Sequence, residues 1–189
     1  MLDPKLLAPE KVRPLMRREY ERLVDLGVFE DERIELLRGQ LVTMSPQGAP
    51  HSTITARLAQ LFSRKLDIDE FDVRAHSPFA ATDDSEPEPD VSVSRRRRRG
   101  AYHPSKALLL VEVAESSLRI DRKIKSEIYA ENGAPEYWIV DVRAKLVHVH
   151  TEPVDGEYTK LRQVPRTGVL RPTKLPGIRL PVAMVFGAR

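Results

Sequence analysis

Two acidic residues in apolar surroundings are the first candidates for chemistry. Asp90 follows Pro89 and opens the segment PDVSVS, and Glu112 interrupts the apolar run LLLVEV. A carboxylate in such a run is costly to bury unless it is paired, protonated or bound to a metal. If the two segments are neighbouring strands, the two acids could hold a hard divalent cation, since Mg2+ needs only one or two protein carboxylates. A turn cap for Asp90 and a salt bridge for Glu112 are the simpler alternatives.

A lysine downstream of Glu112 could complete such a site. In the segment DRKIKSEIY, Asp121, Lys125 and Tyr129 recur at four-residue spacing, which places them on one face of a helix. Lys125 could then point back toward the strand of Glu112, where an ammonium group positions a metal-bound water or offsets phosphate charge. An exposed pair between Lys125 and Asp121 is the alternative.

A run of arginines and three histidines are weaker candidates. The run could grip phosphates without reading sequence, or it could be a solvated loop. It consists of Arg95, Arg96, Arg97, Arg98 and Arg99. His51 begins a predicted helix; a solvated helix start is favoured over a catalytic role, and a contact with substrate stays open. His148 and His150 alternate along a strand, which could mimic a metal pair but is more typical of a half-exposed strand.

The elements that must position these residues follow from hydrophobic periodicity. Apolar spacing predicts a helix over residues 12–26, and RIELLRGQLVTMSP predicts a hairpin around Arg38 and Gly39. A second helix begins at His51. A third is predicted over residues 120–132, with a buried stripe formed by Ile120, Ile124 and Ile128. Predicted strands are FDVRAHSPF, PDVSVS, KALLLVEVA, EYWIVDV, KLVHVHT and EYTKLRQV. This order indicates an α/β or α+β fold with a mixed sheet.

Length and composition limit the classes of protein. The chain has 189 residues, 41% of them hydrophobic and 31% charged, which suits a single domain over residues 1–189. The net charge of +3 permits a nucleic-acid partner without requiring one. The absence of cysteine excludes disulfides, thiolate metal sites and cysteine nucleophiles. With no apolar run of about 18 residues and no signal-peptide pattern, we expect a soluble cytoplasmic protein that does not enter the membrane.

Several of these motifs together resemble a known family. The segments RIELLRGQLVTMSP, HSTITARLAQLF, PEPDVSV, LLLVEVAESS and DRKIKSEIYAENGAPEYWIVDV occur in the order typical of the Uma-two family of putative restriction endonucleases. This family belongs to the PD-(D/E)XK nuclease superfamily. The resemblance covers residues 20–150, and residues 151–189 are a strand- and proline-rich C-terminal extension.

The resemblance implies a restriction-endonuclease-like mixed β-sheet flanked by helices, and a metal-dependent endonuclease activity on DNA. Asp90 and Glu112 would bind Mg2+ or Mn2+, and Glu35 would supply a third carboxylate, although RIELL could also be a strand with a solvent-facing acid. The superfamily places a lysine two residues after the second acid, where this chain has Ala114. Lys125 matches a lysine of the family pattern on the next helix and is the natural substitute.

The resemblance leaves three functional readings open. The first is an active endonuclease that cuts duplex DNA as a homodimer. The second is a nucleic-acid-binding accessory protein of a mobile element or defence system whose active site has decayed, as Ala114 suggests. The third is a structural homodimer module whose sheet edges pair. Metal binding separates the first from the second, and nucleic-acid binding separates both from the third.

Overall fold

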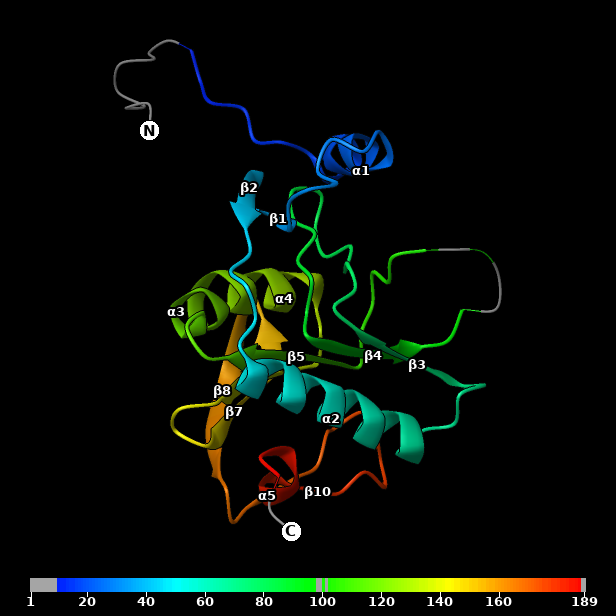
Figure 1. Ribbon diagram of the computed structural model, residues 1–189, viewed down its shortest axis with the longest axis vertical. Coiled ribbons are helices and arrows are strands. Elements are labelled where there is room, and N and C mark those ends of the chain that lie inside the picture. Colours follow the sequence, from blue (N-terminus) through cyan, green and yellow to red (C-terminus); the bar gives the residue numbers. More distant parts are fainter. Residues whose placement is uncertain (1–9, 98–99, 101, 188–189) are drawn as a thin grey trace.

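A six-stranded sheet forms the centre of the computed structural model, which describes residues 10–97, 100 and 102–187 (Figure 1). The strand order is β3-β4-β5-β6-β7-β8, and β5 and β6 run parallel whereas the other neighbours run antiparallel. The predicted mixed sheet is therefore confirmed. Its strands are β3 (Phe71–Ala75), β4 (Val91–Arg95), β5 (Leu109–Ala114), β6 (Glu136–Asp141), β7 (Leu146–Val154) and β8 (Glu157–Pro165).

One face of the sheet is covered by the helix α2 (Ala49–Lys65) (Figure 1). Its buried residues Ile54, Leu58 and Phe62 recur at helical spacing, so they form one apolar stripe that packs against the sheet. The C-terminal segment joins the same apolar cluster. That segment contains β9 (Val169–Leu170), β10 (Leu180–Pro181) and the short helix α5 (Val182–Val185).

The opposite face of the sheet is covered by an interrupted helix between β5 and β6. It consists of α3 (Leu118–Ile120), the π-helical turn η2 (Asp121–Lys125) and α4 (Ser126–Asn132), which ends at Gly133 with a left-handed φ of 79°. Successive side chains of a strand point to opposite faces. In β5, Leu109, Val111 and Val113 join the α2 cluster. Glu112 therefore points toward the interrupted helix.

The predicted isoleucine stripe on this helix is wrong. Ile128 is buried, but Ile124 is 40% exposed, whereas Asp121 and Lys125 are 1% and 4% exposed. The physical reason is the π-helical turn, whose i→i+5 hydrogen bonds add a residue to the turn and rotate the face that follows. The polar residues at positions 121 and 125 consequently point into the protein instead of lying at the edge of an apolar stripe.

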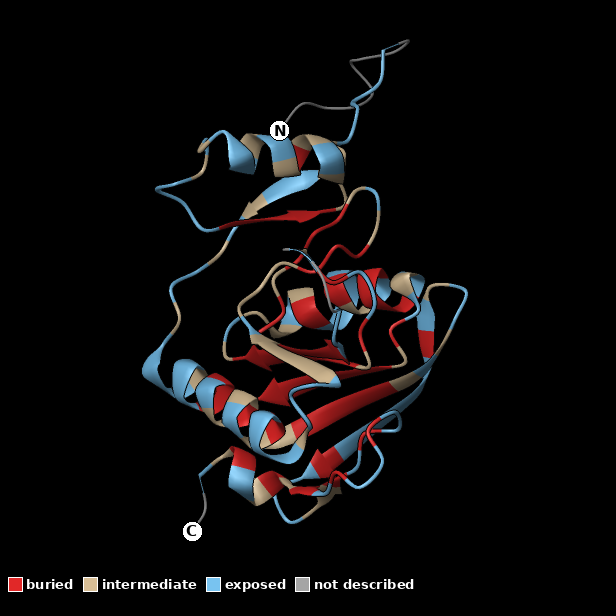
Figure 2. Ribbon diagram, turned by 90° about the vertical axis from the view of Figure 1, so that its right-hand side faces the viewer, coloured by how far each residue is buried: buried red, intermediate tan, exposed pale blue. Residues whose placement is uncertain are grey.

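An N-terminal unit lies beyond the interrupted helix, at one end of the molecule (Figure 2). It comprises α1 (Arg17–Asp25), β1 (Ile34–Leu37) and β2 (Gln40–Thr43). The helix is shorter than predicted because Met16 is its N-cap, where the Glu19 carboxylate accepts the Met16 N–H. The predicted hairpin is confirmed, and Arg38 and Gly39 form its turn with φ angles of 52° and 71°.

Arg38 also fastens the hairpin to the rest of the protein. Its guanidinium donates two hydrogen bonds, of 2.5 and 2.7 Å, to the carboxylate of Glu131 on α4. This bidentate geometry fixes the direction as well as the distance between the two elements.

No described helix is both long enough and apolar enough to cross a membrane.

Candidate active site

A polar cavity lies where β4, β5, the interrupted helix and the N-terminal hairpin meet. Four buried carboxylic residues from separate elements line it together with a single buried lysine. These residues are Glu35, Asp90, Glu112, Asp121 and Lys125. Burying four carboxyl groups beside one ammonium leaves negative charge that must be neutralised by protons or by further cations.

Asp90 lies at the first position before β4, directly across from β5. Val91 pairs with Val111 in the antiparallel register, so Asp90 is opposite Glu112 at the same end of the two strands. The Asp90 carboxylate accepts a 2.7 Å hydrogen bond from the Val113 N–H. The two strands are thus joined through this side chain as well as through their ladder.

Two histidines hold the same carboxylate. His51 Nε2 lies 3.1 Å from Asp90 Oδ2, and His76 Nδ1 lies 3.3 Å from Oδ1. Burial raises the pKa of Asp90, but the hydrogen bonds from His51 and His76 outweigh it and hold the pKa well below its usual range. Asp90 is therefore ionised, and its two oxygens are oriented by partners on α2 and after β3.

Glu112 is a buried acid of the cavity, on the central strand β5. Its Oε1 accepts hydrogen bonds from the Tyr129 hydroxyl at 2.7 Å and from Lys125 Nζ at 3.1 Å. Among the described residues these are its side-chain hydrogen bonds, and both are made to the same oxygen, so Oε2 remains for another ligand. Burial raises the pKa of Glu112 well above its usual value, and the attraction of Lys125 only partly opposes this.

Lys125 lies between two carboxylates. Its Nζ is 3.0 Å from Glu35 Oε2 and 3.1 Å from Glu112 Oε1. Burial lowers the pKa of Lys125, but Glu112 and Glu35 outweigh that effect and raise it above its usual value, so the ammonium stays charged. The Glu88 N–H also donates to Glu35 Oε2, at 3.2 Å. Glu35, on β1, is thereby drawn into the cavity and is not a solvent-facing acid.

Asp121 closes the cavity on the side of the π-helical turn. Its carboxylate accepts a 2.5 Å hydrogen bond from the Ser117 hydroxyl. Burial raises the pKa of Asp121 to about 6, with Lys125 acting in the opposite direction. The side chains of Asp121, Lys125 and Tyr129, which are four residues apart, are thus all buried on the inward face of this helix.

The described arginines of the run, Arg95 to Arg97, are not part of this cavity. Arg95 ends β4, and five residues of strand at about 3.3 Å each put it roughly 17 Å from Asp90. Arg95 pairs with Glu70 at 3.1 Å and stacks on Phe71, and Arg96 lies 3.6 Å from Asp69. Arg97 lies over the ring of Tyr102. Arg98 and Arg99 are outside the described residues.

The histidines divide between two places. His51 does line the cavity, but it contacts Asp90, a role the sequence did not indicate. His148 and His150 lie elsewhere on β7 and are buried, which corrects the half-exposed strand we expected. The reason is that β8 and the interrupted helix cover this part of β7; Arg122 and Ser126 of that helix reach the two imidazoles.

His76 also contributes to the site, and no sequence pattern indicated it. It follows the last residue of β3 and has a left-handed φ of 46°, so its position depends on a local bend. Its partner Asp90 is distant in the chain. No motif marks the pair, and only the antiparallel pairing of β3 with β4 brings the two residues together.

The donor atoms of the cavity suit a hard cation but do not form a compact triad. Its acidic ligands are carboxylate oxygens, the atoms that Mg2+ and Mn2+ prefer. Among the residues that the structure describes, no three carboxylate or histidine ligand atoms of this cavity lie within 4.8 Å of one another. Glu35 is separated from Glu112 by the Lys125 ammonium. The arrangement therefore favours two carboxylate ligands, Asp90 and Glu112.

Comparisons with known proteins place the chain in a family. The Uma2 model, described as "Putative restriction endonuclease", matches residues 17–183, which run from the start of α1 into α5. A solved structure of "a putative nuclease belonging to DUF820" from Anabaena variabilis ATCC 29413 has a similar fold, with a TM-score of 0.74 and 14% sequence identity over 92% of this chain and 98% of that chain. No curated protein sequence matches. The family match confirms the resemblance seen in the motifs, and the chain belongs to the Uma2 family.

Proposed function

We propose that this protein is a metal-dependent endonuclease that hydrolyses phosphodiester bonds in duplex DNA, with Mg2+ or Mn2+ as its cofactor, acting in the cytoplasm. The observation that carries the proposal is the excess of buried carboxylates over buried cations in one cavity. Membership of a family described as "Putative restriction endonuclease" supports a hydrolytic reaction on nucleic acid.

Asp90 and Glu112 are the residues that would hold the cation. Asp90 is ionised and oriented, and Glu112 has one oxygen outside its described hydrogen bonds. A divalent cation would take the place of the proton that burial favours on Glu112. When bound, such a cation supplies Lewis-acid polarisation of the phosphate and a more acidic water. Glu35, expected as a third ligand, is engaged by Lys125 instead, and we assign it the role of holding that ammonium.

The other residues of the cavity orient these ligands and balance charge. His51 and His76 fix the two oxygens of Asp90, and Tyr129 fixes Glu112. Lys125 offers a permanent positive charge to an incoming phosphate, as electrostatic stabilisation requires. It reaches Glu112 from the helix side, so Ala114 does not leave the second acid without a lysine.

The test is cleavage of supercoiled plasmid and of short duplexes in Mg2+ or Mn2+. Asp90→Asn and Glu112→Gln should each lower the rate by at least about a hundredfold, since each removes one ligand of the cation. Asp141→Asn is the matched control, because Asp141 lies at the end of a strand and, like Asp90, accepts a backbone N–H, but lies outside the cavity. Melting curves verify that each variant folds.

Equal nicking by wild type, Asp90→Asn and Glu112→Gln would remove the catalytic assignment. Duplex binding without a detectable Mg2+ or Mn2+ site, measured by calorimetry, would instead support a decayed nuclease. We further propose a homodimer, because two facing sites would cut both strands of one bound duplex. Sedimentation at several protein concentrations tests this part separately.

A further inference from the structure

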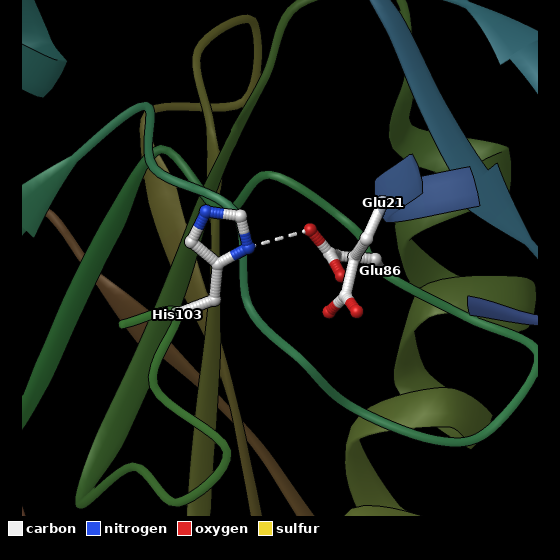
Figure 3. Close-up of side chains that lie close together, drawn as sticks. All are labelled: Glu21, Glu86 and His103. Carbon is white, nitrogen blue, oxygen red and sulfur yellow. Dashed lines mark hydrogen bonds and ion pairs between the residues drawn. The ribbon is translucent and has the colours of Figure 1, made fainter. Parts of the chain in front are cut away.

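A second group of metal-binding residue types lies outside the cavity of Asp90. It consists of Glu21 on α1, Glu86 in the segment before β4 and His103 in the segment before β5, and Figure 3 shows the three side chains converging from these segments (Figure 3). One ligand atom from each residue lies within 4.8 Å of the others. None of the three lines the cavity of Asp90 and Glu112.

Glu86 is the residue that points to a missing ligand. Its side chain is 2% exposed, and its Oε1 lies 2.8 Å from His103 Nδ1. Its Oε2 is buried and, among the described residues, has no hydrogen-bond partner. A buried carboxylate oxygen without a partner costs free energy. The nearest cation, the Arg17 guanidinium, is 4.0 Å away and is bound to Glu21.

The charges of the group do not balance without a further cation or a proton. Arg17 offsets one of the two carboxylates, which leaves one negative charge beside the His103 imidazole. Burial, followed by the contact with Glu21, raises the pKa of Glu86 to about 8. Without a bound metal ion, the Glu86 carboxyl would therefore carry a proton near neutral pH. A metal ion would compete with that proton for the carboxylate oxygen.

We propose that Glu21, Glu86 and His103 form a zinc-type divalent cation site that is separate from the nuclease centre. One imidazole nitrogen with two carboxylate oxygens is a three-ligand set that Zn2+ accepts, with water completing the tetrahedron. The mixed nitrogen and oxygen set distinguishes it from the two carboxylates, Asp90 and Glu112, proposed for the nuclease centre. Glu21 and His103 also line an open cleft, which gives an ion and a water access from solvent.

A cation here would join three segments that are distant in the sequence. Glu21 belongs to the N-terminal unit that carries Glu35, whereas Glu86 and His103 flank the β4 strand that begins after Asp90. Glu86 already pairs with Leu36 of β1 through a β-bridge. The ion would thus clamp the N-terminal unit to the sheet, and its role is structural.

The experiment is a ZnCl2 titration against a chromophoric chelator, performed in an Asp90→Asn, Glu112→Gln background that lacks both proposed cation ligands of the nuclease centre. We expect one Zn2+ per chain and a higher melting temperature with Zn2+. Removing one ligand should weaken binding at least about tenfold. His103→Ala is the main variant, because its side chain is 43% exposed and its loss leaves the core intact, and Glu86→Gln is the second.

Asp25→Asn is the matched control, since Asp25 is one turn from Glu21 and lines the same cleft but is not in the group. It should leave Zn2+ affinity within a factor of about two. The proposal is overturned if His103→Ala binds Zn2+ as tightly as its background, if Asp25→Asn weakens binding equally, or if the background binds no Zn2+. Co2+ spectra give a second readout, because loss of the imidazole changes the visible bands. None of these outcomes depends on nuclease activity.

Discussion

Lys125 determines the charge balance of the candidate active site. Its ammonium contacts Glu35 and Glu112 at nearly equal distances, and its side chain is almost fully buried. A buried ion pair contributes little net stability when compared with apolar residues of equal volume, but removing one partner leaves the other uncompensated. The residue is therefore expected to matter for folding as well as for any reaction with phosphate.

We predict that Lys125→Met lowers the free energy of unfolding by about 3–5 kcal/mol, because two buried carboxylates lose their cation. Lys123→Met is the matched control: Lys123 lies in the same π-helical turn but is exposed, so its substitution should cost less than about 0.5 kcal/mol. Adding Glu35→Gln to Lys125→Met should recover part of the loss. Urea denaturation at neutral pH measures all three, and equal costs for the two lysine substitutions would contradict the prediction.

At the scale of elements, the sequence predicted what is local or strongly patterned. The Arg38–Gly39 turn, the helix over Ile54 and Phe62 and the buried strand of Glu112 each follow from short-range patterns, and the structure has all three. The π-helical turn could not be predicted from hydrophobic periodicity, because the 3.6-residue period assumes a regular α-helix. The four-residue spacing did indicate that Lys125 points toward the strand of Glu112, but it did not indicate that Asp121 is buried.

The hairpin turn offers a test of how closely the N-terminal unit is packed. Gly39 has a φ of 71°, and a Cβ added there would lie 2.2 Å from the Cβ of Pro14. Gly133 has a similar φ of 79°, but a Cβ added there would meet no atom within 4 Å. The two glycines thus share the backbone conformation and differ in the space around them.

We predict that Gly133→Ala costs about 1 kcal/mol, the usual penalty for a left-handed residue with a Cβ. Gly39→Ala should cost a further 1–3 kcal/mol or so, because it adds steric overlap with Pro14 to the same penalty. Chemical denaturation of both variants provides the comparison. If the two substitutions are equally destabilising, the close approach of Pro14 to the hairpin is not a feature of the protein in solution.

At the scale of the whole molecule, the candidate nuclease centre and the described arginines of the run lie at opposite ends of β4. Arg95 and Arg96 are paired with Glu70 and Asp69 from the turn before β3, which reduces the charge they offer to a phosphate. Arg97 contacts Tyr102 and, within the described part of the chain, pairs with no carboxylate. A separation of about 17 Å along β4 corresponds to roughly five phosphates along one DNA strand. A duplex bound at the cavity could reach these side chains.

The plot of the logarithm of the DNA association constant against the logarithm of the salt concentration has a negative slope. We predict that Arg97→Ala reduces the magnitude of this slope by about 1, as expected for one lost phosphate contact. Arg95→Ala and Arg96→Ala should change the slope less, because their guanidinium groups already have acidic partners. Fluorescence anisotropy of a labelled duplex across a salt series, in a Glu112→Gln background that prevents cleavage, measures the slopes. A further test is Glu70→Gln, which frees Arg95 and should steepen the slope. Identical slopes for wild type and Arg97→Ala would exclude this part of the surface from the DNA path. If Arg97→Ala changes the slope but Glu70→Gln does not, the DNA contact is made by Arg97 and not by Arg95.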